Sequence, residues 1–408
     1  MNSSISLDEV RLATLKLLNY CKVNDWAGYD PYDALNSKLF EALPLLDSRI
    51  PRLALTQALK RSPINIRRPL LVPKTQNAKA IALFLSALLK LSKAELADQE
   101  DLVHPMIDRL VALRSRDVPY WCWGYSFAWQ TRDMGMVPRG TPNLVCTMFV
   151  ASALLDAYEQ RQDSRCLEMA VSAAEYILNE LYWHDGNNVG FSYPLPSLRT
   201  QTHNANFLAA ALFCRVHKHT GEEKFLSPAL KVARFSAAKQ HSDGSWYYGE
   251  RRSQRWIDNF HTGYNLCALQ DICRDAGTTE FESCIRNGFE FYRAHFFRED
   301  GAPRYFHNST YPIDIHCVAQ SIITLLAFRD LHPGNVRLAD SVFRWTMKHM
   351  WDDRGFFYYR VLRFCTIRTS YMRWSQAWML LALSTVLQEL HTSQQDQRID
   401  NAAALVRA

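Results

Sequence analysis

The chain has 408 residues, enough for one large domain or two ordinary ones. Hydrophobic residues make up 48% and charged residues 22%, which excludes a disordered or collagen-like chain and predicts a large buried core. The net charge is only +6, which argues against a dedicated nucleic-acid-binding protein.

The beginning of the chain lacks the basic and apolar regions of a signal peptide, and no stretch approaches the ~20 apolar residues of a membrane span. The ten cysteines form no CxxC pair and lie mostly in apolar stretches, as reduced core cysteines do. We therefore expect a cytoplasmic protein without a transmembrane segment.

Apolar residues at helical spacing predict an all-α chain. Two helices are expected first, over 7–22 and 37–60. Six later stretches are apolar nearly all round: 78–91, 142–159, 203–220, 259–276, 316–331 and 375–390. More polar helices with one apolar stripe alternate with them, at 102–115, 165–182, 223–241, 278–295 and 337–350.

Six buried helices, each followed or preceded by an amphipathic one, need an arrangement that hides all the buried ones. A closed ring does so, and we predict an (α/α)6 toroid of six inner and about six outer helices, with 7–22 and 37–60 supplying an outer partner and closing the ring. An open solenoid is the second architecture considered. Residues 1–390 are expected to form a single domain, followed by a polar, frayed tail over 391–408.

The connections that lead into the inner helices are rich in aromatic residues. Four of them, at 184–202, 242–258, 299–315 and 352–374, are degenerate copies of one loop, and 118–141 is a longer counterpart. Such loops would meet at one end of the ring, where aromatic faces suit sugar rings, although the same side chains could simply fill the hollow. The aromatic residues predicted to bind substrate are Trp123, Tyr125, Trp129, Tyr193, Trp246, Tyr247, Tyr305, Tyr359 and Trp374.

The same loops are also rich in arginine, which favours an anionic ligand because a guanidinium group binds carboxylate or phosphate through two hydrogen bonds. We select Arg132, Arg251 and Arg373 as anion-binding residues. The alternative for each is an ordinary surface ion pair.

Three successive inner helices are expected to begin with a histidine. His261 and His316 are predicted acid/base catalysts, with Tyr248 as a second proton donor and Asp258 and Asp314 as orienting partners. Polar residues near the helix starts and in the turn GYDPYDALNS are predicted to bind substrate: Asp30, Asp33, His203, Asn204, Asn206, Asn259 and Tyr264.

These residue types favour lyase or epimerase chemistry on an acidic glycan. Hydrolysis would need two carboxylates flanking the glycosidic bond, for which Glu250 and the four aspartates are candidates. A non-catalytic glycan-binding role is the third hypothesis. No spaced Cys/His set and no glycine-rich phosphate loop is present, so no metal and no cofactor are expected.

The sequence resembles the six-hairpin toroid group of carbohydrate-active proteins and, more narrowly, the VpsJ-like family of bacterial exopolysaccharide biosynthesis. The motifs that carry the resemblance are GYDPYDALNS, CWGYSFAWQTR, PRGTPN, NANFLAA, DGSWYYGE, WIDNFHTGYNL, DGAPRYF and DIHC. The resemblance implies a cytoplasmic protein of a bacterial exopolysaccharide, capsule or lipopolysaccharide gene cluster. We expect its partners to be an acidic oligosaccharide, polysaccharide or lipid-linked glycan, and polysaccharide assembly proteins.

Overall fold

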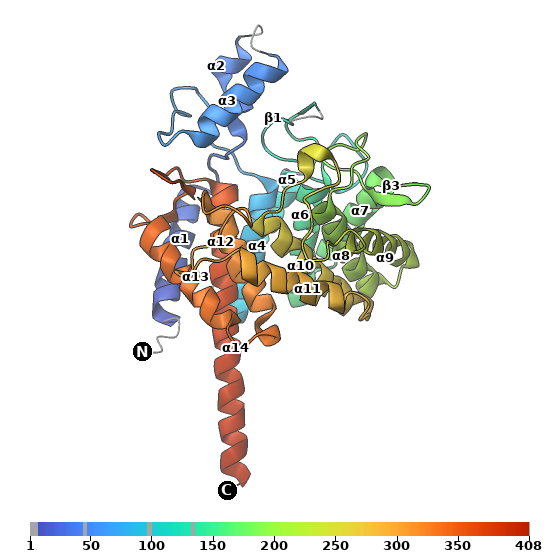
Figure 1. Ribbon diagram of the computed structural model, residues 1–408, viewed down its shortest axis with the longest axis vertical. Coiled ribbons are helices and arrows are strands. Elements are labelled where there is room, and N and C mark those ends of the chain that lie inside the picture. The colour runs from blue at the N-terminus through green and yellow to red at the C-terminus, as the bar shows by residue number, and fades with distance from the viewer. Residues whose placement is uncertain (1–6, 44–46, 96–99, 132–134, 408) are drawn as a thin grey trace.

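The computed structural model describes residues 7–43, 47–95, 100–131 and 135–407. Six inner helices form a closed ring, because each contacts the next and the last returns to the first. In ring order they are α4 (Ala78–Lys93), α6 (Leu144–Arg161), α8 (His203–Thr220), α10 (Asn259–Ala276), α12 (Ile315–Ala327) and α14 (Trp378–Arg407). The closed ring confirms the predicted toroid and excludes the open solenoid (Figure 1).

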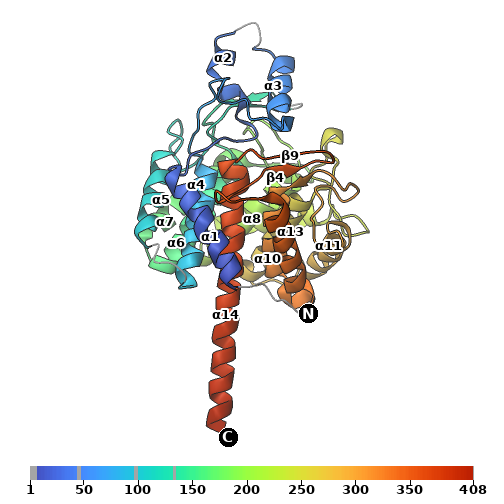
Figure 2. The same ribbon diagram turned by 90° about the vertical axis from the view of Figure 1, so that its left-hand side faces the viewer.

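Each inner helix packs against one outer helix. The outer helices are α5 (Glu100–Ala112), α7 (Ser164–Tyr176), α9 (Glu223–Ala237), α11 (Glu282–His295) and α13 (Asn335–Met350), which pair with α4, α6, α8, α10 and α12. The N-terminal α1 (Leu7–Val23) completes the outer layer against α14 (Figure 2).

Side-chain caps fix the starts of four inner helices. The side chains of Asn77, Asn143, Asp258 and Asp314 each accept a hydrogen bond from a backbone N–H in the first turn of α4, α6, α10 and α12. At the other end, Gly277 stops α10 with a φ of +63°, a backbone conformation that suits glycine. These side chains therefore define where four of the inner helices begin.

The loops repeat one backbone contact, which brings them to one end of the ring, here called the mouth. The first N–H of an inner helix donates to the carbonyl of a tyrosine in the next loop along the chain. The pairs are His203 N to Tyr248 O (3.1 Å), Asn259 N to Tyr305 O (2.9 Å) and Ile315 N to Tyr359 O (3.1 Å). Three of the four predicted copies, 242–258, 299–315 and 352–374, are thus equivalent in space.

Short antiparallel strands support these loops. They are β1 (Trp129–Gln130) with β2 (Met136–Val137), β3 (Tyr182–Asp185) with β4 (Asn188–Phe191), β6 (Trp351–Asp352) with β7 (Phe356–Phe357), and β5 (Ile313–Asp314), β8 (Arg360–Val361) and β9 (Thr366–Ile367) in one sheet. In that sheet Asp314 lies opposite Arg360.

Residues 37–76, here called the cap, do not join the outer layer, and the prediction that 37–60 closes the ring was wrong. The cap contains α2 (Lys38–Glu41) and α3 (Arg49–Arg61) and lies beyond the mouth (Figure 1). It has only a small core of its own, formed by Leu59 and Val72 with Ala34. A buried ion pair between Arg67 Nε and Asp33 Oδ1 (2.7 Å) attaches it to the ring.

The C-terminal segment differs from the expected frayed tail. The boundary expected at residue 390 falls inside α14, which continues as a helix to Arg407 and extends beyond the ring, away from the mouth (Figure 1). Within the described part of the chain, no helix is long and apolar enough to span a membrane.

Candidate active site

A histidine–carboxylate pair stands at the start of α10. Asp258 caps the helix through its Oδ1, which accepts from the backbone N–H of His261 (3.0 Å). Its Oδ2 lies 2.7 Å from His261 Nδ1 and also accepts from Trp256 Nε1 (2.9 Å). The Nε2 atom of His261 has no hydrogen-bond partner among the described residues, and the side chain is 19% exposed. This is the arrangement of an oriented general base.

A second pair lies one turn further along α10. The hydroxyl of Tyr264 is 2.5 Å from Nε2 of His316, which is the second residue of α12. The His316 ring is enclosed by Phe260, Trp374 and Trp378, with ring centroids 4.5–4.6 Å away, and its Nδ1 is buried without a partner.

Burial decides the charge state of this second pair. Desolvation, followed by the charges of Lys79 and Arg373, holds the pKa of His316 well below its usual value. Desolvation likewise raises the pKa of Tyr264 well above its usual value. Both groups are therefore neutral at pH 7, and the short Oη–Nε2 distance is that of a hydrogen bond between two neutral side chains.

Buried and half-buried aromatic rings surround these two pairs. Tyr248 stacks on Trp256 (4.6 Å) and contacts the His261 ring (4.5 Å), and burial raises its pKa, so its hydroxyl stays protonated. The rest of the wall is continuous, because ring contacts connect Tyr125, Trp129, Tyr32, Trp374, Phe260 and Tyr305 in that order. Tyr193 joins this wall through its hydroxyl, which interacts with that of Tyr125.

The carboxylates and guanidinium groups of the mouth neutralise one another. Arg373 binds both oxygens of Asp30, at 2.7 and 2.8 Å, in a fully buried pair, so the expected anion-binding role of Arg373 is replaced by a structural one. Asp314 is likewise paired with Arg360 and accepts from Trp374 Nε1. Asp33 is paired with Arg67, and burial raises its pKa to about 6 despite that partner.

Two predicted stacking residues lie in the core instead of the mouth. Trp123 is fully buried and its Nε1 donates to Leu110 O (2.7 Å). Trp246 is buried against Gly288, where a Cβ atom would lie 2.7 Å from the indole, and its Nε1 donates to Ser236 O. Both tryptophans wedge between helices, so neither can contact a ligand.

The three histidines expected at the starts of inner helices lie there, but at three different positions of the first turn. His203 is the first residue of α8, His316 the second of α12 and His261 the third of α10. Each step along a helix turns a side chain by about 100°. His203 therefore points toward the outer layer, where its ring bonds Glu250 (2.9 Å) and Ser236 (3.3 Å).

Other predicted binding residues have structural partners or lie aside. Asn206 bonds Ser236 and Phe191 N, and Asn259 bonds Tyr292 and Ser321. Tyr247 contacts His241, and Tyr359 is buried against Tyr371. Asn204 has a buried Oδ1 atom without a hydrogen-bond partner, and Arg251 is exposed without an ion pair among the described residues. Arg132 lies outside the described residues.

One residue that sequence reasoning missed is Lys79. Its Nζ lies 4.0 Å from the ring centroid of Phe149, 5.3 Å from that of Trp378 and 5.7 Å from that of Tyr264. Desolvation holds its pKa well below the usual value. The signal was available: Lys79 is the second residue of α4, the same helix position as His316.

A cavity of about 210 Å³ lies inside the ring, beneath the mouth. Phe149, Tyr264 and Trp378 line it, and ion pairs such as Arg215–Asp156 lie toward the far end of the inner helices. Tyr264 thus separates the mouth from this interior space.

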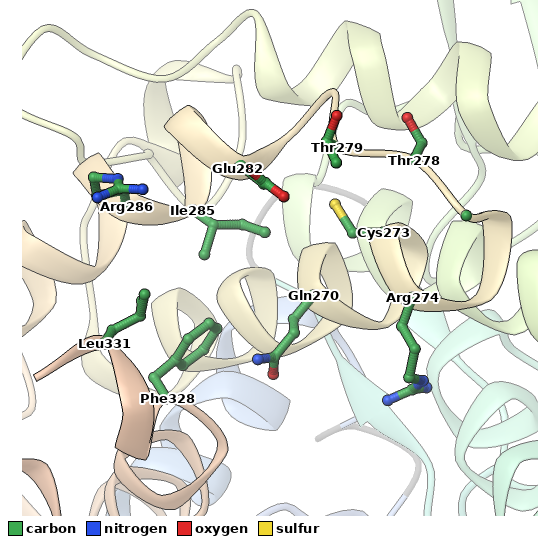
Figure 3. A pocket seen from close by; sticks show the side chains of 11 residues that line it. Gln270, Cys273, Arg274, Thr278, Thr279, Glu282, Ile285, Arg286, Phe328 and Leu331 are labelled. Carbon is green, nitrogen blue, oxygen red and sulfur yellow. The ribbon is translucent and has the colours of Figure 1, made fainter.

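A second cavity, of about 500 Å³, is separate from the mouth. It lies between the end of α10 and the start of α11, where Gln270, Arg274, Glu282 and Arg286 line it (Figure 3). None of the residues that form the mouth lines it. Among the described residues, no group of three or more His, Cys, Asp or Glu could hold a metal ion.

No family model and no curated protein sequence matches this chain. Solved structures do match it. Cellobiose 2-epimerase from Bacillus thermoamylovorans B4167 has a TM-score of 0.59 at 12% identity, over 78% of this chain and 90% of that one. The GH76 α-mannanase BT2949 of Bacteroides thetaiotaomicron has a TM-score of 0.59 at 13% identity, over 77% and 87%.

A structure of UGL with dGlcA-Glc-Rha-Glc has a TM-score of 0.60 at 12% identity, over 91% of this chain and 94% of that one. The chain has the (α/α)6 six-hairpin toroid fold. At these identities the likeness establishes the fold, and the chemistry has to be argued from the mouth.

Proposed function

We propose that the chain is a carbohydrate-active enzyme that moves protons on a sugar bound at the mouth, as an epimerase or a lyase does. The observation that carries the proposal is the Asp258–His261 pair, which leaves Nε2 of the imidazole without a partner beside the aromatic wall. Similarity to proteins named as a sugar epimerase and a cellobiose 2-epimerase supports this class of reaction.

In this mechanism His261 Nε2 removes a proton from a carbon next to a carbonyl or carboxylate group of the sugar. Asp258 holds the proton on Nδ1 and stabilises the imidazolium that forms. In an epimerase, a second group returns a proton to the opposite face of the same carbon. In a lyase, the electron pair instead forms a C=C double bond as the neighbouring C–O bond breaks, and a second group protonates the leaving oxygen. Tyr248 and the Tyr264–His316 pair are the proton donors at hand.

The aromatic wall would bind the sugar through its C–H faces. An anionic sugar is supported by Lys60 of the cap, whose Nζ donates to Tyr32 Oη (2.7 Å) and lies 6.0 Å from the Trp374 ring. No carboxylate partner of Lys60 is present among the described residues. We take the substrate to be an acidic glycan or its lipid-linked precursor. From the resemblance to VpsJ-like proteins, we propose that the reaction belongs to bacterial exopolysaccharide, capsule or lipopolysaccharide biosynthesis. It would take place in the cytoplasm, in association with polysaccharide assembly proteins.

Hydrolysis by paired carboxylates has less support from the geometry. Asp30, Asp33, Asp258 and Asp314 are buried and each is held by an arginine or a histidine, and Glu250 is bound to His203. An inverting or retaining hydrolase needs two carboxyl groups that reach the glycosidic bond.

The test is to incubate the chain in D₂O with a panel of neutral and acidic oligosaccharides. The proposal predicts either deuterium at one sugar carbon with a new epimer, seen by NMR, or the ultraviolet absorbance of an unsaturated uronate. New reducing ends with neither signal would establish a hydrolase and overturn the proposal. Saturable binding without turnover on the full panel would support the non-catalytic role instead.

A further inference from the structure

The positive charge of the chain is concentrated in the cap. Residues 37–76 hold eight Lys and Arg but only two Asp and Glu, whereas the whole chain holds 47 and 41. The rest of the chain therefore has 39 of each kind and no net charge. Some of the basic residues are used internally, such as Arg67, but Lys38, Arg61 and Arg68 are exposed.

The cap also exposes apolar side chains on a helix face. On α3, Thr56 and Leu59 are buried, whereas Ile50, Ala54 and Ala58 are exposed. These exposed positions are four or eight residues apart, so they lie on one face, opposite the face that packs. A surface helix of a globular protein normally carries polar residues there. Gln57 and Arg61 are exposed on the same face, so the outer face of α3 combines apolar with polar and basic side chains.

Other large apolar residues of the cap are exposed as well. In the described part of the chain, thirteen large hydrophobic residues are exposed, and six of them lie in this short segment. They are Leu39, Leu43, Ile50, Ile64, Ile66 and Leu71. The small core of the cap cannot bury them, and α2 and α3 lie at the end of the molecule opposite the C-terminus (Figures 1 and 2).

We propose that the cap docks on a membrane surface that contains anionic lipids, with its isoleucines and leucines in the interfacial region and its lysines and arginines at the headgroups. Exposed aliphatic side chains interspersed with basic ones are the composition of peripheral membrane-binding segments. A nucleic acid would require the charge but not the aliphatic residues. Protein interfaces are enriched in aromatic residues and depleted in lysine.

Docking through the cap would place the mouth next to the membrane. The last turn of α3 carries Lys60, which contacts Tyr32 in the aromatic wall. A glycan attached to a membrane lipid would then meet the mouth without leaving the bilayer. The docking proposal does not depend on the proposed enzymatic function, because membrane binding is measured on vesicles that carry no glycan.

The experiment is co-sedimentation of the full chain with vesicles of phosphatidylcholine, alone or mixed with phosphatidylglycerol. We expect binding to the mixed vesicles to be at least about tenfold stronger and to weaken as salt is added. Two double variants test the two components. One carries Ile50→Glu and Ile64→Glu, the other Arg61→Glu and Arg68→Glu, and each should lower binding about tenfold or more. All four side chains are exposed, so the variants should fold, which thermal unfolding checks.

The matched control is Val336→Glu with Arg337→Glu, which changes one exposed apolar and one exposed basic residue far from the cap. This variant should bind as the unchanged chain does. The proposal is overturned if binding does not require phosphatidylglycerol, or if the cap variants bind as well as the control. It is also overturned if the Ile50/Ile64 variant converts a dimer to a monomer in light scattering, since a second copy would then be the occupant.

Discussion

The starts of α8 and α10 are built from similar residues, but their histidines have different surroundings. Both follow a loop with a glycine turn and aromatic residues, and both place a histidine in the first turn. At α8 the histidine is the first residue and its ring bonds Glu250 and Ser236. At α10 it is the third, and its Nε2 is left without a partner. A shift of two residues thus separates a structural histidine from a candidate base.

The strongest test of this comparison replaces each histidine. With a substrate found as described above, His261→Ala should lower kcat by roughly 10²- to 10⁴-fold, the contribution of a positioned acid/base group. His203→Ala should leave kcat within a few-fold, but lower the free energy of unfolding by about 1–3 kcal/mol, because Ser236 and Glu250 lose their partner. Equal losses of kcat in the two variants would contradict the comparison.

The next test concerns the ion pairs of the mouth. Arg373→Met should lower the free energy of unfolding by about 3–5 kcal/mol, because Asp30 is left buried without its partner. Urea unfolding measures the change. The matched control is Arg354→Met, whose pair with Asp352 lies at the surface and should contribute about 0–1 kcal/mol. If the two variants are destabilised equally, the buried pair is not what holds the mouth together.

Much of the architecture follows from the sequence because it depends on periodicity. The helices expected at 203–220 and 259–276 have those bounds in the structure, and the repeat of six gave the ring. The direction of loop side chains could not be predicted from the sequence. Trp123 and Trp246 share loops with mouth residues, yet both point into the core. Direction within a loop depends on backbone turns that composition does not reveal.

Two further differences between the sequence predictions and the structure, at Lys79 and at residues 37–60, have physical reasons. Lys79 was overlooked because it sits in an apolar run, where its stem packs like a hydrophobic residue. The segment 37–60 was expected in the outer layer because its leucines have helical spacing. A pattern of that kind shows that a helix has an apolar face, but it does not show what covers that face.

Lys79 gives a test in which stability and activity should move in opposite directions. Its pKa is lowered by burial, so at pH 7 folding costs about 1.4 kcal/mol for each unit by which this pKa falls below its unfolded value, until the buried amine is neutral at that pH. Lys79→Met keeps the stem and removes this cost, and urea unfolding should show a more stable chain. Turnover should fall if the amine faces the substrate. A variant that is less stable would show that the amine has a partner.

The smallest effect expected is a pH dependence of stability that comes from His316. Burial among Phe260, Trp374 and Trp378 is the main cause of the lowered pKa of His316. At mildly acidic pH this histidine is therefore protonated in the unfolded chain and neutral in the folded chain. Stability from this residue is therefore complete above its unfolded pKa of about 6.5 and is lost as the pH falls below it, at about 1.4 kcal/mol per unit. His316→Gln removes the titrating group, so its free energy of unfolding should fall less steeply between neutral and mildly acidic pH. His203→Gln keeps His316 and should show the steeper dependence of the unchanged chain. Identical slopes in all three chains would mean that the His316 ring accepts a proton where it lies, and the neutral Tyr264–His316 pair would then be wrong.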